Sequence, residues 1–384
     1  MNTSFPQPDS EAVAHSNALL SAIQALIAKE GGWINFAQLM DAALYTPGLG
    51  YYSGGAKKFG IGGDFVTAPE ISPLFAQTLA RQVAQVLAVT NGDVLELGAG
   101  TGKLAADLLP ALQALGCAPQ HYFILEVSAY LRQIQKESLQ KSLSSELLKR
   151  VVWLDVLPQN FVGVMLGNEV LDAIPVHLIH KTADSLYERG VAYDGNFIWQ
   201  DRLLETGHLF DLAASLGLPN EYLTEICPAA SGLIASLAQA LQCGVIIMLD
   251  YGFSAREYYH PQRNLGTLMC HYQHYSHTEP LIYVGLQDIT AHVDFTSIAH
   301  AGVGHGLALS GFGTQAQFLM NCGILELMSQ VSPRDMANYA PLAAAAQKLL
   351  SPAEMGDLFK VIAFSKQIEE PLLGFSAGDK THTL

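Results

Sequence analysis

The chain has 384 residues, of which 50% are hydrophobic and 14% are charged, a composition typical of a compact globular protein. Its net charge is -15, with 20 Lys and Arg residues against 35 Asp and Glu residues. Such a surface repels phosphate backbones, so nucleic-acid binding is not expected. The five cysteines are scattered and include no C-x-x-C pair, which argues against a disulfide framework.

The N-terminal residues and the hydropathy pattern lead us to expect a cytoplasmic protein. Residues 1–20 contain acids and prolines but no Lys or Arg, unlike a secretory signal or a transit peptide. The longest apolar run, residues 245–249, is far too short to cross a bilayer. We therefore expect no insertion into a membrane.

The first 90 residues predict helices around a glycine-rich loop. Apolar positions recur every three or four residues over 11–30 and end at Gly31-Gly32, which predicts a helix. Glycine and proline are concentrated over 46–72, and a long loop inside a compact domain is often functional. Ser72-Pro73 then predicts the start of a helix that runs to about Val89.

From residue 91 onward, strand and helix patterns alternate. The strands are expected at 93–97, 121–126, 151–154, 162–168, 244–251, 306–311 and 358–364. The helices are expected at 103–115, 128–143, 228–242, 292–301 and 314–321. This alternation predicts a doubly wound α/β fold, with a mostly parallel sheet covered by helices on both faces.

Two segments interrupt the alternation. Residues 175–241 contain strand-like runs around Asp184 and Asp194-Gly195, followed by helices, and 265–287 form a shorter insertion after the fifth strand. We therefore expect four parts: an N-terminal helical cap with the glycine-rich loop at 1–90, the first half of the core at 91–174, an insertion that shapes an acceptor cleft at 175–243, and the second half of the core at 244–384.

A glycine loop follows the first strand of the expected sheet, with Gly98, Gly100 and Gly102 before a helix that begins at Lys103. Ligands of such sheets bind beyond the carboxyl ends of the strands. A phosphate-binding P-loop would need Ser or Thr where the chain has Leu104. A dinucleotide site would need a third glycine where Lys103 stands, which weakens that alternative without removing it.

S-adenosylmethionine fits the loop better because it carries a sulfonium and an ammonium group, which favour an acid such as Glu96 at the head of the loop. A second acid, Glu126, ends the next strand, where it could accept hydrogen bonds from ribose hydroxyls. Asp155 could contact an adenine edge beside the apolar Val156, although it could equally cap a turn before Pro158.

A polar cluster follows the fourth strand, where a methyl acceptor would arrive. Asn168, Glu169 and Asp172 supply one amide and two carboxylates within five residues. Methyl transfer requires mainly that the acceptor be positioned and desolvated. Carboxylates would hold a cation, and the fork of an arginine guanidinium matches a pair of them. The alternative is that Glu169 and Asp172 only cap the following turn.

Long motifs stand in a fixed order along nearly the whole chain: PGLGYY at 47–52, GDFVTAPEIS at 63–72, ELGAGTG at 96–102, LEVS at 125–128, NEVLDAIPV at 168–176, DYG at 250–252 and DITAHVDF at 288–295. Together they resemble the MidA family of S-adenosylmethionine-dependent methyltransferases. The mitochondrial members of that family act as assembly factors of respiratory complex I and methylate an arginine of one of its subunits. Ala99 stands where many relatives carry proline.

The resemblance implies a Rossmann-like class I methyltransferase fold with a seven-stranded, mostly parallel sheet, S-adenosyl-L-methionine as the cofactor and a protein as the acceptor. It places Thr67, Pro69 and Glu70 near the methionine end of the donor pocket. It also places Val127 and Asn168 at the cofactor. His292 would act as a base or face the acceptor, unless it is only a packed polar residue.

Several alternatives stay open at this stage. The chain could be a non-catalytic assembly factor that keeps the binding fold, or an NAD-dependent oxidoreductase. An exposed face of the helical cap could form a homodimer. His271, His274 and His277 are spaced in steps of three, but no further ligand completes a set around them, so no metal site is expected.

Overall fold

The computed structural model describes residues 6–54 and 66–384. The chain divides into two compact units. Unit 1 combines residues 1–65, 172–230 and 255–292, and unit 2 combines 66–171, 231–254 and 293–384. The chain therefore passes between the units several times, and neither unit is one continuous segment.

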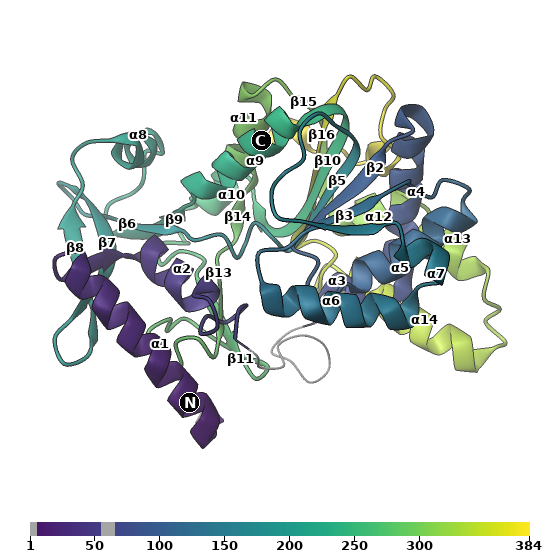
Figure 1. Ribbon diagram of the computed structural model, residues 1–384. Helices are drawn as coiled ribbons and strands as arrows, with labels where there is room; N and C mark the ends of the chain where they lie inside the picture. Colours follow the sequence, from purple (N-terminus) through teal and green to yellow (C-terminus); the bar gives the residue numbers. More distant parts are fainter. Residues whose placement is uncertain (1–5, 55–65) are drawn as a thin grey trace. The chain divides into compact units, whose positions relative to one another are not determined.

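Unit 2 is built on a sheet with the strand order β15-β16-β10-β5-β2-β3-β4 (Figure 1). Neighbours from β10 to β4 are parallel, β16 is antiparallel to β10 and β15, and the short β14 adds to β10. This is the expected doubly wound α/β fold. Its strands are β2 (Asp93–Leu97), β3 (Tyr122–Leu125), β4 (Val151–Leu154), β5 (Phe161–Asn168), β10 (Leu241–Phe253), β14 (Val293–Asp294), β15 (Ala308–Thr314) and β16 (Phe359–Lys366).

Several helices of unit 2 begin where the sequence supplies a capping side chain. Ser72 caps α4 with Pro73 in its first turn, Ser128 caps α6, and Asp294 caps α11. The helices are α3 (Ala68–Ile71), α4 (Pro73–Thr90), α5 (Lys103–Ala114), α6 (Ala129–Ser142), α7 (Ser145–Leu148), most of α9 (Pro228–Ala240), α11 (Phe295–Gly304), α12 (Gln315–Asn321), α13 (Ile324–Ser329) and α14 (Met336–Leu350).

Strand β10 shows why this sheet is covered on both faces. Val245, Ile247 and Leu249 belong to a buried core with residues of α4 and α5. Ile246 and Met248 are equally buried, and alternation along a strand turns them to the opposite face. An uninterrupted apolar run is typical of a parallel strand that is buried on both sides.

Unit 1 contains an antiparallel sheet in the order β1-β7-β6-β9, with β8 paired to β7, and a second sheet in the order β12-β11-β13. Apolar residues of α1 and α2, among them Leu19, Ile23 and Met40, pack with Leu178 and Val191 of the first sheet. The elements are α1 (Ser10–Lys29), β1 (Trp33–Asn35), α2 (Phe36–Tyr45), β6 (His177–Lys181), β7 (Leu186–Tyr193), β8 (Phe197–Leu203), α8 (His208–Ser215), β9 (Tyr222–Ile226), α10 (Ala255–Tyr258), β11 (Met269–Tyr272), β12 (Tyr275–His277) and β13 (Asp288–Thr290).

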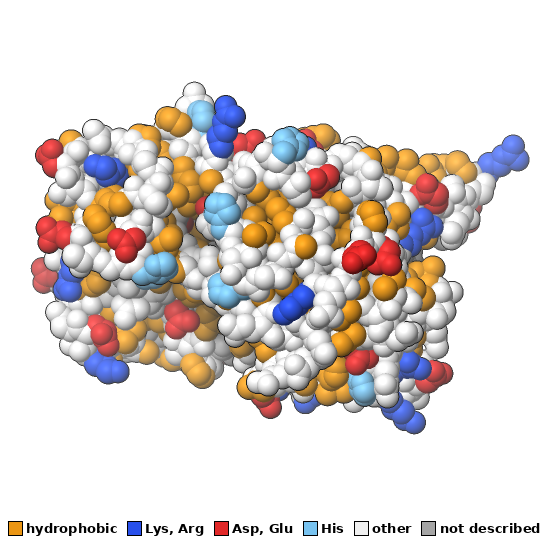
Figure 2. Space-filling model, turned by 90° about the horizontal axis from the view of Figure 1, so that it is seen from above, with side chains coloured by type: hydrophobic (Ala, Val, Ile, Leu, Met, Phe, Trp, Pro, Cys, Tyr) orange, Lys and Arg blue, Asp and Glu red, His pale blue; other side chains and the backbone are white. Residues whose placement is uncertain are grey.

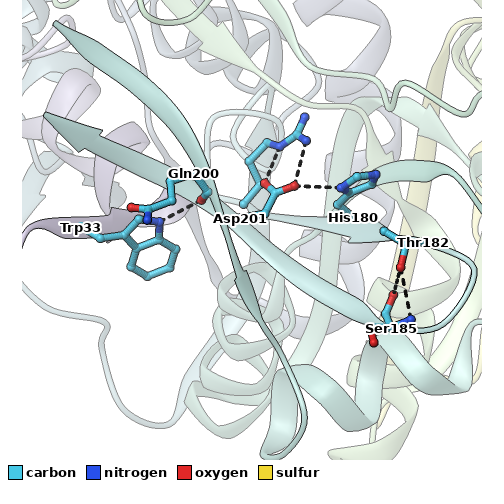
Figure 3. Close-up of polar contacts among 7 residues, drawn as sticks. Trp33, His180, Thr182, Ser185, Gln200 and Asp201 are labelled. Atoms are coloured by element: carbon cyan, nitrogen blue, oxygen red, sulfur yellow. Dashed lines mark hydrogen bonds and ion pairs between the residues drawn. The ribbon is translucent and has the colours of Figure 1, made fainter. Parts of the chain in front are cut away.

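Polar side chains fix strand β8 of unit 1. Asp201 accepts hydrogen bonds of 2.8 and 3.0 Å from Arg189, and its other contact is His180 at 2.8 Å (Figure 3). Burial alone would raise the pKa of Asp201, but the hydrogen bonds from Arg189 and His180 outweigh burial and lower it. The Trp33 indole donates to the Gln200 carbonyl at 2.9 Å and ties β8 to β1.

Two expectations about secondary structure were wrong, and one helix was missed. Asp184 and Asp194-Gly195 lie in the turns between β6, β7 and β8, not in the strands, because such residues favour turns. The helix expected from residue 292 begins at Phe295, since Asp294 is its cap. Helix α14 (Met336–Leu350) is an element that was not predicted from the sequence.

Positive charge is dispersed over the one face of the molecule shown in Figure 2, where Lys and Arg side chains are scattered. In the part of the chain that the structure describes, no helix combines the length and the apolar character needed to span a bilayer.

Paired glycines hold the centre of the unit 2 sheet. Gly163 of β5 has φ +130°, and a Cβ placed on it would lie 2.0 Å from the Asp93 carbonyl oxygen on β2. Gly244 of β10, with φ +139°, would collide in the same way with the Gly163 carbonyl. The close approach of these strands therefore requires glycine at both positions.

Gly163→Ala should lower the free energy of unfolding by about 3 kcal/mol, because it adds both a steric clash and an unfavourable φ angle. Urea denaturation measures this change. Gly232→Ala is the control, since a Cβ there meets no atom within 4 Å and the residue lies on a helix, where alanine is favoured. Equal stability of the two variants would contradict the prediction.

Candidate functional site

The glycine loop lies where the order of the sheet reverses. Strand β2 is the first strand of this sheet along the chain, with β3 and β4 on one side of it and β5 and β10 on the other. Doubly wound sheets bind their ligands at such a reversal of strand order. Gly98, Gly100 and Gly102 all have positive φ angles, of 58°, 54° and 81°. A Cβ on Gly100 would meet no atom within 4 Å, so the loop backbone is open for a ligand to approach.

Glu96 lies on β2, two residues before the first glycine of this loop, and its side chain is buried. Its carboxylate accepts a hydrogen bond of 2.7 Å from the Tyr122 hydroxyl. Burial raises the pKa of Glu96 to about 7, against the opposing effect of Tyr122, and the nearby Glu126 raises it further. A positively charged ligand would favour the ionised form and so relieve the cost of burying this acid.

Glu126 follows β3 and is also buried. One carboxylate oxygen accepts from the Ser128 backbone at 2.9 Å and the other from the Gln135 amide at 3.0 Å. Burial raises the pKa of Glu126, while those two hydrogen bonds and the charge of Arg132 oppose the rise. The carboxylate is thus held in one orientation at the carboxyl end of its strand, as a group that binds ribose hydroxyls should be.

Gln135 of α6 organises this region, and the sequence analysis missed it. Its buried amide donates to the Gly100 carbonyl at 3.1 Å and to Glu126, and its oxygen accepts from the Trp153 indole at 3.0 Å. One signal was available in the sequence. Gln135 stands between Leu131 and Leu139 on the buried stripe of the helix, where a polar residue needs partners.

Two apolar side chains project from the neighbouring ends of β3 and β4. Val127 is 82% exposed and Val156 is 75% exposed, and the two strands pair along their length. Asp155 forms an ion pair of 2.7 Å with Arg132, which also donates to the Glu126 carbonyl at 2.8 Å. The result is an apolar surface with an acid beside it, suited to a flat heteroaromatic ring.

The short helix α3 brings the expected residues 67–70 to the glycine loop. Thr67 precedes the helix, Pro69 is buried in its first turn, and Glu70 accepts a hydrogen bond from the Thr101 hydroxyl. The expected motif at 63–72 and the glycine-rich loop lie partly outside the described residues, since residues 55–65 are not described.

The turn after β5 carries Asn168 and Glu169. Glu169 adopts φ +53°, a left-handed conformation that is uncommon for residues other than glycine and is typical of functional sites. Its carboxylate accepts from the Asn168 amide at 3.1 Å and from the Ala68 backbone at 3.4 Å. The buried Asp250 fixes the turn by accepting from the Leu171 backbone at 2.9 Å.

Unit 2 therefore brings most of the expected site residues together. Helix α3 contacts both the glycine loop and Glu169, and a Cβ on Gly98 would lie 3.3 Å from the Val170 side chain. The candidate donor site consists of Thr67, Pro69, Glu70, Glu96, Gly98, Gly100, Gly102, Glu126, Val127, Asp155, Val156 and Asn168, with Gln135 added by the structure, and Glu169 lies next to it.

Asp172 and His292 belong to unit 1 and are placed there by their own contacts. The Asp172 carbonyl accepts from the Ala291 backbone at 3.0 Å. The His292 backbone donates to the Thr267 hydroxyl at 3.1 Å. Among residues 6–54 and 66–384, no group of three His, Cys, Asp or Glu side chains could hold a metal ion.

Comparison with known proteins gives a consistent result. A family of S-adenosyl-L-methionine-dependent methyltransferases matches residues 78–313. The chain belongs to this family. A Burkholderia thailandensis protein, crystallised with S-adenosyl-homocysteine, is 50% identical, covers 99% of this chain and all of its own, and superposes with a TM-score of 0.96. The chain is therefore an enzyme of the class I methyltransferase fold that uses S-adenosyl-L-methionine, as the resemblance implied.

The curated relatives are less similar in sequence, and their names state a more specific activity. The Caenorhabditis elegans "Protein arginine methyltransferase NDUFAF7 homolog, mitochondrial" is 29% identical over 91% of this chain and 88% of its own length. The human "Protein arginine methyltransferase NDUFAF7, mitochondrial" is 28% identical, over 87% and 80%. These names contradict the expected cytoplasmic location, which was wrong because it relied on composition and on the first residues alone.

Gln135→Ala should weaken the binding of S-adenosylhomocysteine about tenfold, because it removes the hydrogen bonds that orient Glu126 and the Gly100 carbonyl. Isothermal titration and the ligand-induced rise in Tm both measure the effect. Gln133→Ala is the matched control, since Gln133 lies on the same helix and is exposed. Undiminished affinity of the Gln135 variant would contradict this role.

Glu96 should make the ligand-free protein less stable as pH rises. The folded chain binds this proton more tightly, because the pKa rises from 4.5 to about 7. Its stabilising contribution is therefore complete below pH 4.5 and is lost as pH rises to about 7, which amounts to about 3 kcal/mol. Urea denaturation at pH 5 and pH 8 should show most of this loss in the native protein and a smaller one in Glu96→Gln. Equal losses would refute the assignment.

Proposed function

We propose that this protein is a protein arginine N-methyltransferase. The observation that carries the proposal is the strained turn at Asn168-Glu169, which orients a carboxylate beside the glycine loop. The names of the curated relatives support the same acceptor class. A carboxylate at this position would attract a guanidinium group and orient its nitrogen.

In this proposal the residues of unit 2 have separate roles. The bound cofactor supplies an electrophilic methyl group on a sulfonium. Glu96 lies near the positive charges of the methionine part, Glu126 accepts the ribose hydroxyls, and Val127 and Val156 contact the adenine. Glu169 positions the acceptor nitrogen and receives the proton that the nitrogen loses.

Asn168 supplies a further contact for the acceptor. Its amide nitrogen donates to Glu169 at 3.1 Å. Its oxygen is buried and has no hydrogen-bond partner within the described part of the chain. A buried carbonyl oxygen without a hydrogen-bond donor costs free energy. An N–H group of the acceptor would donate the hydrogen bond that the Asn168 oxygen lacks.

The acceptor is proposed to be a protein, and a subunit of a respiratory complex is the first candidate to test. His292 and Asp172 are proposed to contact the acceptor from unit 1, and a homodimer is the proposed assembly, which light scattering would check. The oxidoreductase alternative is not favoured, because the loop lacks the third glycine and the chain belongs to a methyltransferase family. The non-catalytic alternative predicts binding of the cofactor without turnover.

Glu169→Gln should lower the rate of methyl transfer at least about 100-fold, because it removes the proton acceptor and the negative charge. The assay incubates the protein with methyl-labelled cofactor and candidate subunits and then identifies methylarginine by mass spectrometry. The variant should still bind S-adenosylhomocysteine. Glu137→Gln, on the exposed face of α6, is the control.

Two results would contradict the proposal. Label on lysine or on a small molecule, without methylarginine, would reject the acceptor class. Cofactor binding by the native protein without transfer to any acceptor would favour the non-catalytic alternative instead.

A further inference from the structure

A buried tyrosine and a buried aspartate form the centre of a second polar group, in unit 1. The Tyr52 hydroxyl donates to Asp288 Oδ1 at 2.9 Å, and the Ile289 backbone donates to the same oxygen at 3.0 Å. The ring of Tyr45 stacks on that of Tyr52, with centroids 5.6 Å apart. Asp288 is only 2% exposed, so its carboxyl group is withdrawn from water.

Asp172 lies beside the same group. It is 5% exposed, and its carbonyl accepts from the Ala291 backbone, three residues after Asp288. Burial raises the pKa of Tyr52 well above its ordinary value, and the charges of Asp288 and Asp172 raise it further. Two buried carboxylates therefore act on one hydroxyl, an arrangement that a cation would stabilise.

Thr290 provides an independent sign of a ligand. It is 2% exposed, and its hydroxyl has no hydrogen-bond partner among residues 6–54 and 66–384. Thr290 and Asp288 stand two positions apart on β13, so their side chains point to the same face of the strand. Buried hydroxyl groups rarely lack a hydrogen-bond partner. A ligand that donates a hydrogen bond to the Thr290 hydroxyl is the simplest explanation.

We refer to these residues as the tyrosine-aspartate cluster; its members are Tyr45, Tyr52, Asp172, Asp288 and Thr290. We propose that this cluster binds the guanidinium group of an arginine side chain of the acceptor protein. The inference rests on the proposed function and adds the residues that select the acceptor.

A guanidinium matches the cluster better than other cations do. It carries five N–H donors in one plane, which can serve two carboxylates and a hydroxyl together. Its flat face also packs on tyrosine rings. An ammonium has three donors around a point charge and gains less from the rings.

The test measures binding and does not depend on turnover. Nα-acetyl-L-arginine amide is titrated into the full chain with saturating S-adenosylhomocysteine, by ligand-observed NMR. Nα-acetyl-L-citrulline amide, of the same shape without the charge, is the matched probe. The native protein should prefer the arginine probe at least about tenfold, and Asp288→Asn should lose the preference. Thr290→Val, which keeps the volume, should weaken arginine binding about tenfold.

Two variants control for general effects of buried polar residues. Glu225→Gln changes a buried acid of unit 1 that is bonded to Thr267 and Tyr258, and Thr78→Val changes a buried hydroxyl that is already bonded to the Leu74 carbonyl. Both should keep the arginine preference. A retained rise in Tm with S-adenosylhomocysteine shows that each variant is folded, and Thr290→Val remains the deciding variant where Asp288→Asn does not fold.

Equal binding of the two probes by the native protein would overturn the proposal, as would undiminished arginine affinity in Thr290→Val or a loss of preference in the controls. These outcomes differ from failure of the proposed function. Methylarginine formed with equal probe binding rejects the cluster alone, whereas arginine preference without methylarginine in any acceptor rejects the enzymatic proposal alone.

Discussion

The hydrogen bonds of Gln135 are the interaction on which the candidate donor site depends. Parallel strands bring the ends of β2, β3 and β4 to one edge of the sheet, but they do not fix the loops that follow. One buried amide joins the Gly100 carbonyl, the Glu126 carboxylate and the Trp153 indole. Both its donor protons and its acceptor are used, so the amide has a single favourable orientation. The positions of glycine loop and acid are therefore coupled.

Burial of acidic side chains is the second constraint, and it explains why positively charged ligands are favoured. Glu96, Glu126, Asp172 and Asp288 are each at most 5% exposed, although a carboxylate loses much hydration when it is buried. The polar contacts around Glu96 do not compensate fully, because its pKa stays raised to about 7. A sulfonium or ammonium in unit 2, and a guanidinium in unit 1 as proposed, would each offset that cost.

The sequence predicted the core of unit 2 well because its signals are local. The apolar run of β10, the caps Ser72 and Ser128 and the glycine loop each determine their own segment. Unit 1 was harder to predict, since its sheet pairs β1 near the N-terminus with β7, more than 150 residues later. Short antiparallel strands joined by Asp-rich turns gave a pattern whose turns were mistaken for strand centres, at Asp184 and Asp194.

The site followed the same division between local and long-range signals. Glu96, Glu126 and Glu169 could be proposed as site residues from the sequence because each lies at or next to the carboxyl end of a recognisable strand. Gln135 and Thr290 could not be assigned a role, because the partners of Gln135 lie on other segments and the partner proposed for Thr290 is a ligand. Each nevertheless interrupts a buried pattern with a polar group, and burial makes such a group costly unless it is paired. A polar residue on an otherwise apolar stripe is thus the sequence signal by which buried residues with a candidate functional role could be recognised in this fold.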